Sequence, residues 1–277
     1  MKMRWTSVVS LLVVGILVLL ATGAYWIAPF SPEETFFDGL TQEGAPTSPS
    51  SKYWFGTDLL GRDLFSRVVW GAQTSLVIGV VANGAAVLIG STVGITAGYL
   101  RGWFGGLLMR FTDLMMCFPA LLLAIVLAAI FSPSLWIVAL VIALVNWVQI
   151  ARITYTQTVS LSESGFIEAT RCIGATNTYL LLRHILPHLV PTILVYGTLG
   201  VSTTVLMEAT LSYLGIGVQP PTPSWGNIIF ENQSYFTTAP WLVFIPGACI
   251  LVVAVAFNLL GDALQENIDP SSKPRPD

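Results

Sequence analysis

The sequence carries very little charge for its length. Of its 277 residues, 10% are charged and 54% are hydrophobic. Soluble domains carry about 25% charged residues, so a water-soluble globule of this size would lack the charge to cover its surface. The composition therefore indicates an integral membrane protein. The net charge of −3 also leaves no strongly basic patch that would suggest nucleic-acid binding.

Cysteine and histidine are scarce as well, which argues against metal chemistry. Cys117, Cys172 and Cys249 are far apart and form no C-x-x-C pair, so they fit neither a zinc site nor a disulfide framework. With only two histidines, a multi-histidine metal site is not expected. No G-x-x-x-x-G-K-[ST] phosphate loop and no nucleophile–base set is present, so we expect a non-catalytic chain that binds neither metal nor ATP itself.

Long apolar stretches, in contrast, are abundant. A helix needs about 20 apolar residues to cross a bilayer core. Six stretches reach that length: residues 7–28, 75–100, 107–131, 134–154, 188–213 and 241–261. None alternates like a barrel strand, so the predicted fold class is an all-α polytopic membrane protein with six transmembrane helices. The first stretch continues through Tyr25, Trp26 and Ile27, which favours an uncleaved helix over a signal peptide.

The distribution of lysine and arginine predicts the orientation of these spans. With the N-terminus inside, nine basic residues are cytoplasmic, namely Lys2, Arg4, Arg101, Arg110, Arg152, Arg171, Arg183, Lys273 and Arg275. Three are outside: Lys52, Arg62 and Arg67. We therefore expect a cytoplasmic N-terminus (1–6), a core membrane domain (75–261) with a cytoplasmic loop (155–187), and a cytoplasmic C-terminus (262–277). Segments 29–74 and 214–240 are expected on the outer side, the second with a short amphipathic surface helix in SWGNIIFENQSYF.

Several polar and small residues within the spans predict helix contacts. Gly90, Gly94 and Gly98 are four apart, so they lie on one helix face and let another backbone approach closely. Pro119 is expected to kink the third span. Arg110 and Asp113 are spaced for a local ion pair, and Asn146 and Gln149 could bridge helices or line a polar path, bridging being the commoner case.

Glu208 is the one acidic residue deep in a predicted span. An ionised side chain near mid-membrane costs on the order of 2.5–3.5 kcal/mol on insertion scales. The side chain is therefore expected to face the bundle interior or a water-filled cavity, or to be protonated. A hydrogen-bonded contact between helices and a role in the pathway or outer gate are equally good interpretations of the sequence.

The segment FIEATRCIGATNTYLLLRHILP, residues 166–187, interrupts the apolar spans. A short helix over 164–173 is expected to end at Gly174. A second helix, starting near Thr176 or Thr178, runs through Pro187 into the fifth span. A short exposed helix of this kind can dock into a groove of another protein, and an ordinary cytoplasmic loop fits the spacing equally well.

This segment resembles the cytoplasmic loop of the permease subunits of bacterial ABC importers. That pattern is E-A-A, three residues, G, nine residues, then I-x-L-P, and it is matched by Glu168, Ala169, Gly174, Leu186 and Pro187. Thr170 replaces the second alanine and His184 the isoleucine, a variant similar to that of the dipeptide and oligopeptide branch. FGTDLLGRDLFSRVVWGAQTSL, MRFTDLMMCFPALLLA, ATLSYLGIGVQPPTPSWGNII and AFNLLGDALQENIDP resemble further landmarks of the C-type permeases of dipeptide, oligopeptide and nickel importers.

The resemblance implies a type I importer permease with a MetI-like fold in the inner (plasma) membrane. Its implied partners are a homologous B-type permease, two ABC ATPases that bind ATP and Mg, an extracytoplasmic solute-binding protein and a peptide substrate. The ATPase-coupling residues are then Glu168, Ala169, Thr170, Gly174, Leu186 and Pro187. A nickel or metal-chelate importer is the alternative within this class; a membrane enzyme and a non-transporting assembly subunit are the alternatives outside it.

The resemblance also assigns an ordered outer element close to the partner permease or the solute-binding protein. Its residues are Gly56, Thr57, Asp58, Gly61, Arg62 and Asp63. The other interpretation is plain loop structure, in which Thr57 and Asp58 form turns or caps, Gly61 makes a tight turn, and Arg62 and Asp63 are an exposed pair.

Overall fold

The computed structural model describes residues 5–131 and 134–268, and nearly all of its regular structure is helical. The α-helices are α1 (Trp5–Thr22), α2 (Ala24–Ile27), α3 (Leu64–Leu100), α4 (Gly102–Met116), α5 (Ala120–Ile130), α6 (Leu135–Ser162), α7 (Gly165–Cys172), α8 (Asn177–Leu180), α9 (Leu186–Tyr213), α10 (Trp225–Asn232) and α11 (Trp241–Ile268). Short turns of other helix types are η1 (Phe37–Gly39), η2 (Leu181–Ile185, a π turn) and η3 (Gln233–Tyr235). The predicted all-α class is confirmed.

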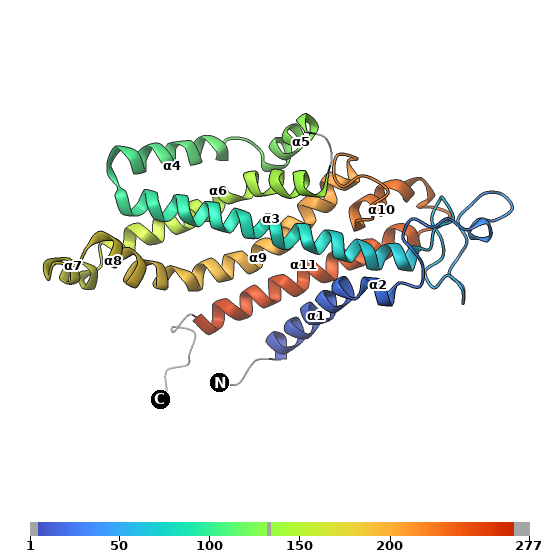
Figure 1. Cartoon of the computed structure of the whole chain (residues 1–277), viewed down its shortest axis with the longest axis horizontal. Helices are drawn as coiled ribbons and strands as arrows, with labels where there is room; N and C mark the ends of the chain where they lie inside the picture. The colour runs from blue at the N-terminus through green and yellow to red at the C-terminus, as the bar shows by residue number, and fades with distance from the viewer. Residues whose placement is uncertain (1–4, 132–133, 269–277) are drawn as a thin grey trace.

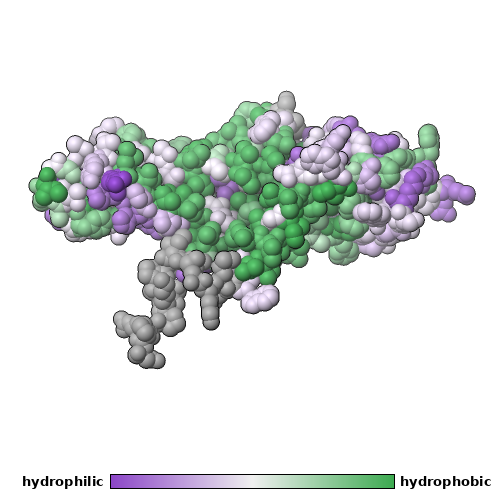
Figure 2. Space-filling view, turned by 60° about the horizontal axis from the view of Figure 1, so that its bottom comes forward, coloured by the Kyte–Doolittle hydropathy of each residue, from purple (hydrophilic) through white to green (hydrophobic). Residues whose placement is uncertain are grey.

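The long helices lie side by side in an elongated bundle (Figure 1). The helices α7 and α8 form one end, called here the α7 end; α10 and residues 28–63 form the other, the α10 end. A broad apolar band separates the more polar ends in the face that Figure 2 shows. Within the described residues, four helices are long and apolar enough to span a membrane, or five if the bent pair α4–α5 counts as one span.

The predicted spans correspond to these helices, with differences in the first two. The first span is divided between α1 and α2 at Gly23, and its apolar helix Ser7–Thr22 is shorter than a usual span. The helix α3 begins at Leu64, well before the predicted residue 75, because the Asp63 carboxylate caps it by accepting from Ser66 N–H at 2.8 Å. The expected kink at Pro119 is confirmed as an 89° bend between α4 and α5.

The glycine face of α3 packs directly against α6, as predicted. A Cβ added at Gly94 would lie 2.2 Å from the carbonyl oxygen of Ala151, and one at Gly90 would lie 2.4 Å from that of Trp147. No side chain fits in that space, so glycine sets the distance between the two helices.

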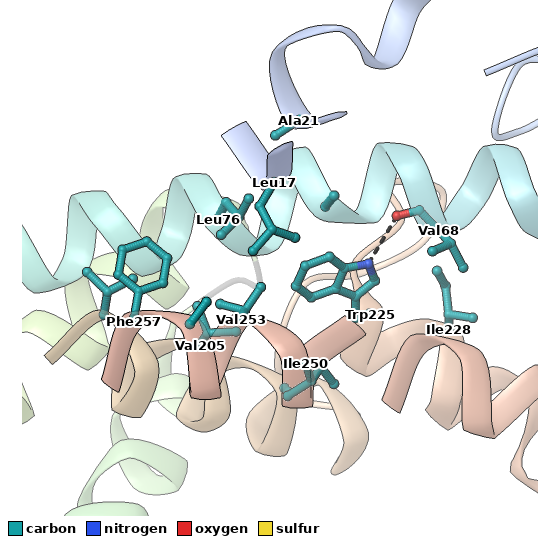
Figure 3. Packing of buried hydrophobic residues seen from close by; sticks show 14 of the residues in the cluster. Leu17, Ala21, Val68, Leu76, Val205, Trp225, Ile228, Ile250, Val253 and Phe257 are labelled. Carbon is teal, nitrogen blue, oxygen red and sulfur yellow. Dashed lines mark hydrogen bonds between the residues drawn. The ribbon is translucent and has the colours of Figure 1, made fainter. Parts of the chain in front are cut away.

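The largest apolar cluster joins α1, α3, α9, α10 and α11 around the buried indole of Trp225 (Figure 3). The indole N–H donates to the carbonyl oxygen of Val68 at 3.0 Å. The predicted helix in 214–240 is therefore present as α10, but its predicted surface position is wrong because α10 is largely buried. Burial is tolerated because Ser224 and Asn227 form a capping box that satisfies the helix N-terminus.

Two predicted polar contacts have different outcomes. Asn146 bridges helices as expected, with its amide donating to the Thr204 hydroxyl at 3.3 Å. Asp113 pairs with Arg152 of α6, so the expected local pair with Arg110 is wrong. The reason is tertiary: α6 brings Arg152 to α4, and a sequence-local partner has no advantage over it.

Candidate functional sites at the two ends of the bundle

The α7 end contains the predicted docking segment as a short helix followed by a tight turn. The helix α7 ends where Gly174 adopts φ +91°, a conformation that strains any residue with a Cβ. The Gly174 N–H donates to the Arg171 carbonyl at 3.0 Å, and the Ala175 N–H donates to that of Thr170 at 3.3 Å. The predicted glycine-terminated helix is confirmed.

The second predicted helix starts immediately after this turn. The Thr176 side chain caps α8 by accepting from Tyr179 N–H at 3.3 Å, as the sequence indicated. From Asn177 the chain is helical through Tyr213, with the η2 π turn between α8 and α9. Pro187 lies at the start of α9. Because proline has no N–H and its ring clashes with the carbonyl four residues earlier, the wider π turn accommodates it.

One face of α7 is anchored to the bundle and the rest is exposed. Ile167 is completely buried in a small apolar cluster with Ile95, Leu180, Ile185 and Leu189. These residues come from α3, α8, η2 and α9, so the cluster connects α7 to the long helices α3 and α9.

The sequence-predicted coupling residues lie mainly on the exposed side. Glu168, Ala169 and Gly174 are exposed, while Leu186 is partly buried against the Ile167 cluster. The Thr170 hydroxyl donates to the Phe166 carbonyl at 2.6 Å within α7, so threonine in place of alanine leaves no polar group unpaired. The structure therefore brings the five pattern positions and Thr170 to one end of the molecule, with a solvent-facing helix at its tip.

A second contact connects α7 to the membrane helix α9 through aromatic rings. The Phe166 ring stacks on His188, with ring centroids 5.5 Å apart, and lies 6.3 Å from His184. Tyr179 meets His184 edge-on at 5.5 Å. We call Phe166, Tyr179, His184 and His188 the aromatic clasp. His184, which departs from the isoleucine of the general pattern, is therefore a packing partner of α7.

The opposite end contains a buried group of charges that we call the outer charge cluster: Asp58, Arg62, Arg67 and Glu231. Arg62 donates through Nε to Asp58 Oδ2 and through Nη2 to Glu231 Oε2, both at 2.6 Å. Arg67 Nη2 donates to the same Glu231 oxygen at 2.8 Å. The side chains of Asp58 and Arg67 have no exposed surface. The cluster thus fastens the 56–63 element to α3 and α10 by desolvated ion pairs, which are costly to break.

The predicted outer element is ordered, but the exposed pair expected for Arg62 and Asp63 is wrong. Arg62 is 4% exposed and bonds to Asp58 and Glu231, while Asp63 is 1% exposed and caps α3. Thr57 bonds to the Gly39 carbonyl and to Thr47 N–H.

The two glycines of this element are both required by its backbone. Gly56 and Gly61 have φ near +78° and +74°. A Cβ at Gly56 would lie 2.5 Å from the carbonyl oxygen of Thr47, and one at Gly61 would lie 2.7 Å from that of Phe36. All six predicted positions are therefore buried parts of one folded unit.

The rest of the 29–63 segment packs around Tyr53. The Tyr53 hydroxyl donates to Asp38 Oδ1 at 2.9 Å, and Lys52 pairs with the same carboxylate while lying over the Phe36 and Tyr53 rings. Hydrogen bonds from Lys52, which has the larger effect, and from Tyr53 hold the pKa of Asp38 below its usual value of 3.8. This segment is folded in spite of its proline- and serine-rich composition.

Sequence reasoning missed two members of the outer charge cluster. Arg67 was counted only as a basic residue of the outer side and Glu231 was not considered, yet the two residues, 164 positions apart, share a hydrogen bond. Asn232 was also missed; its side chain accepts from the Leu59 N–H at 3.1 Å. A usable signal existed, since Arg67 is the one charged residue of α3, but its partner depends on how α10 folds back against α3.

Glu208 lies in the bundle interior, one of the environments expected for it. It is completely buried, and its two oxygens accept from the hydroxyls of Ser75 and Ser212 at 2.9 and 2.8 Å. Ser75 Oγ also accepts from the backbone N–H of Trp225 at 3.3 Å. Glu208 therefore connects α9, α3 and α10 through hydroxyl groups, which fits the interhelical interpretation; a role in gating stays a prediction.

These features define a class of protein before any relative is considered: a multi-pass helical membrane protein with a short exposed helix at one end and an element held by buried ion pairs at the other. Residues 90–274 match the family described as "Binding-protein-dependent transport system inner membrane component", and the chain belongs to that family. It is a permease-type membrane component, as the resemblance implied.

Particular relatives extend the match to nearly the full chain. It is 37% identical over 273 residues, 99% of this chain and 88% of the other, to the dipeptide transport system permease protein DppC of Alkalihalophilus pseudofirmus. It is 40% identical over 268 residues, 96% of this chain and 87% of the other, to the glutathione transport system permease protein GsiD of Escherichia coli. In fold it is similar to a chain of the MetNI methionine ABC transporter solved in inward-facing conformations, with a TM-score of 0.61, 17% identity, and coverage of 74% of this chain and 98% of that one. The predicted MetI-like fold is confirmed.

Proposed function

We propose that this chain is one of two permease subunits of an ATP-driven importer for peptides, and forms half of the translocation pathway. The observation that carries the proposal is α7: a short helix anchored by Ile167, exposed on its other faces, and carrying the importer-loop pattern at the correct spacing. Relatives that carry dipeptide and glutathione transport names support a peptide substrate over nickel or a metal chelate.

The proposed partners follow from the family. A homologous B-type permease completes the pathway, an extracytoplasmic solute-binding protein delivers the substrate, and two ABC ATPases dock on α7. ATP and Mg are bound and ATP is hydrolysed by those ATPases, because this chain has no phosphate loop. The chain itself is non-catalytic and binds no cofactor.

Coupling works through differential contacts. Each arrangement of the ATPase dimer must bind α7 more favourably when the membrane helices are in one particular state. A change in the ATPase dimer then shifts the membrane helices to the other state. The Ile167 cluster and the aromatic clasp supply the rigid connection that such coupling needs, because they join α7 to α3 and α9.

In this arrangement the α7 end is cytoplasmic, as are the N- and C-termini, and the α10 end faces outward from the plasma membrane. The excess of basic residues on the α7 side supports this orientation. Gly56, Thr57, Asp58, Gly61, Arg62 and Asp63 then form an outer element near the solute-binding protein or the partner permease. Their hydrogen bonds and burial support a preformed shape for that contact.

Co-purification of the tagged chain with its ATPases tests the proposal. Gly174→Ala introduces a Cβ at φ +91°, a strain of about 1–2 kcal/mol that distorts the end of α7, and should reduce recovery of the ATPase. Gly165→Ala is the matched control, since both glycines have open space around the added Cβ but Gly165 has no positive φ.

The same complex in proteoliposomes should take up a dipeptide in an ATP-dependent manner. A wild-type chain that recovers no ATPase would refute the permease function. Uptake of nickel without uptake of peptide would refute the substrate class alone.

A further inference from the structure

A cavity of about 900 Å³ opens at the α10 end, beside the outer charge cluster. Its walls come from four separate parts of the chain: residues 25–33, the first turns of α3, Leu135 at the start of α6, and residues 222–223 just before α10. The volume falls within the range of about 300–1,000 Å³ that is typical of small-molecule sites. None of the groups described above as coupling residues lines it.

The lining combines flat apolar surfaces with polar groups that have no partner. Phe30, Trp70 and several prolines (Pro29, Pro32 and Pro223) supply the apolar part. The side chains of Gln73, Thr74 and Thr222 also line the cavity, and within the described residues none of them makes a hydrogen bond.

Polar residues next to the cavity, in contrast, are bonded to other helices. Ser75, the neighbour of Thr74 on α3, donates to Glu208 and accepts from the backbone N–H of Trp225. Asn146 is likewise bonded, to Thr204 of another helix. Ser75 and Asn146 thus bond to groups of other helices, whereas the polar side chains of the cavity face its open space and can bond to a ligand there.

The charge in the lining of the cavity is negative. Glu33, exposed at the rim, is the charged residue among those lining it. The guanidinium of Arg67 is engaged by Glu231 and Asp58, and its Nη1 also donates to the Pro32 carbonyl oxygen at 3.4 Å. The cavity thus favours a ligand with an amide-rich body and a positively charged end.

We infer that this cavity binds an extended segment of the transported peptide by its backbone, with the N-terminal ammonium group directed to Glu33. Each peptide unit carries one N–H donor and one carbonyl acceptor, which complement the amide of Gln73 and the hydroxyls of Thr74 and Thr222. Apolar walls and backbone contacts accept peptides with little regard to their side chains. A lipid chain would leave these polar groups unpaired. The inference deepens the proposed function and rests on it.

Photocrosslinking in the assembled transporter, reconstituted in nanodiscs with its ATPases and solute-binding protein, tests the inference. The probe is the tripeptide Ala-Ala-p-benzoylphenylalanine, with trialanine as competitor and as the substrate for uptake. We expect crosslinks within residues 70–77 or 222–223 that trialanine suppresses. Gln73→Ala and Thr222→Val should each lower the yield about three- to tenfold, the effect of one lost hydrogen bond. Leu88→Ala, exposed on α3 outside the cavity, is the matched control and should leave it unchanged.

The ammonium contact has its own readout. An N-acetylated probe should crosslink more weakly than the free peptide, and Glu33→Gln should remove that difference. Crosslinks elsewhere in a wild-type complex that takes up trialanine would overturn the site while leaving the importer function intact. A photoreactive residue at position 73 that captures the partner permease and no peptide would overturn it too. A wild-type complex that takes up no trialanine would instead refute the peptide function, and this site with it.

Discussion

Replacing Glu231 by glutamine should destabilise the α10 end more than replacing an exposed charged residue would. The glutamate accepts from Arg62 at 2.6 Å and from Arg67 at 2.8 Å, and its side chain is 12% exposed. The amide keeps the shape and one acceptor but removes the negative charge. Two desolvated guanidinium groups then face the single carboxylate of Asp58, and the cluster changes from neutral to a charge of +1.

The size of the effect follows from that imbalance. Removing one partner from a buried ion pair costs about 3–5 kcal/mol, and we take about 3 kcal/mol because the amide oxygen still accepts one hydrogen bond. At about 2–4 °C per kcal/mol for a chain of this size, the unfolding midpoint falls by about 6–12 °C. Tryptophan fluorescence on heating, in nanodiscs, measures it.

Two further variants make the measurement specific. Glu34→Gln makes the same chemical change on an exposed side chain that forms no ion pair within the described part of the chain, and should leave the midpoint unchanged. Arg62→Gln combined with Glu231→Gln removes one charge of each sign, so the loss should be smaller than the sum of the single losses. If Glu231→Gln unfolds at the temperature of Glu34→Gln, the cluster does not hold α10 to α3 and the reasoning fails.

Three further changes test other contacts. Phe166→Leu removes the ring stacking on His188, worth about 0.5–1.5 kcal/mol, and should slow uptake while the ATPase still co-purifies. The exposed Phe104, changed to leucine, is the control. Loss of the ATPase from the Phe166→Leu complex would show that Phe166 contacts the ATPase and not the aromatic clasp. Glu208→Leu leaves the Ser75 and Ser212 hydroxyls without their acceptor and should reduce uptake more than expression, so normal uptake would remove the gating hypothesis. Gly94→Ala forces a Cβ to 2.2 Å from the Ala151 carbonyl and should destabilise the bundle by about 1–3 kcal/mol in thermal unfolding, whereas Gly84→Ala, with open space around it, should not; equal midpoints would contradict glycine-set packing of α3 on α6.

Features that depend on local sequence were predicted well. Gly174 ends α7 and Thr176 caps α8, because both effects operate within a few residues. The break at Pro119 and the close packing at Gly94 follow equally from the missing N–H of proline and the missing side chain of glycine.

Features that depend on how helices fold back were predicted poorly. Asp113 was assigned to Arg110 three residues away, yet α6 brings Arg152 to it. Likewise, α10 was placed on the surface because its segment is polar, but its capping box allowed it to be buried.

The sequence alone determined that this chain is a helical membrane protein of the importer-permease class, because apolar length and the spacing of the loop pattern are local properties. Tertiary structure decided which charges meet. The four residues of the outer charge cluster come from two regions of the chain some 160 positions apart, and only the return of α10 against α3 removes them from water together. The same return places residues 222–223 against α3 and so completes the cavity, whose walls no sequence pattern connects.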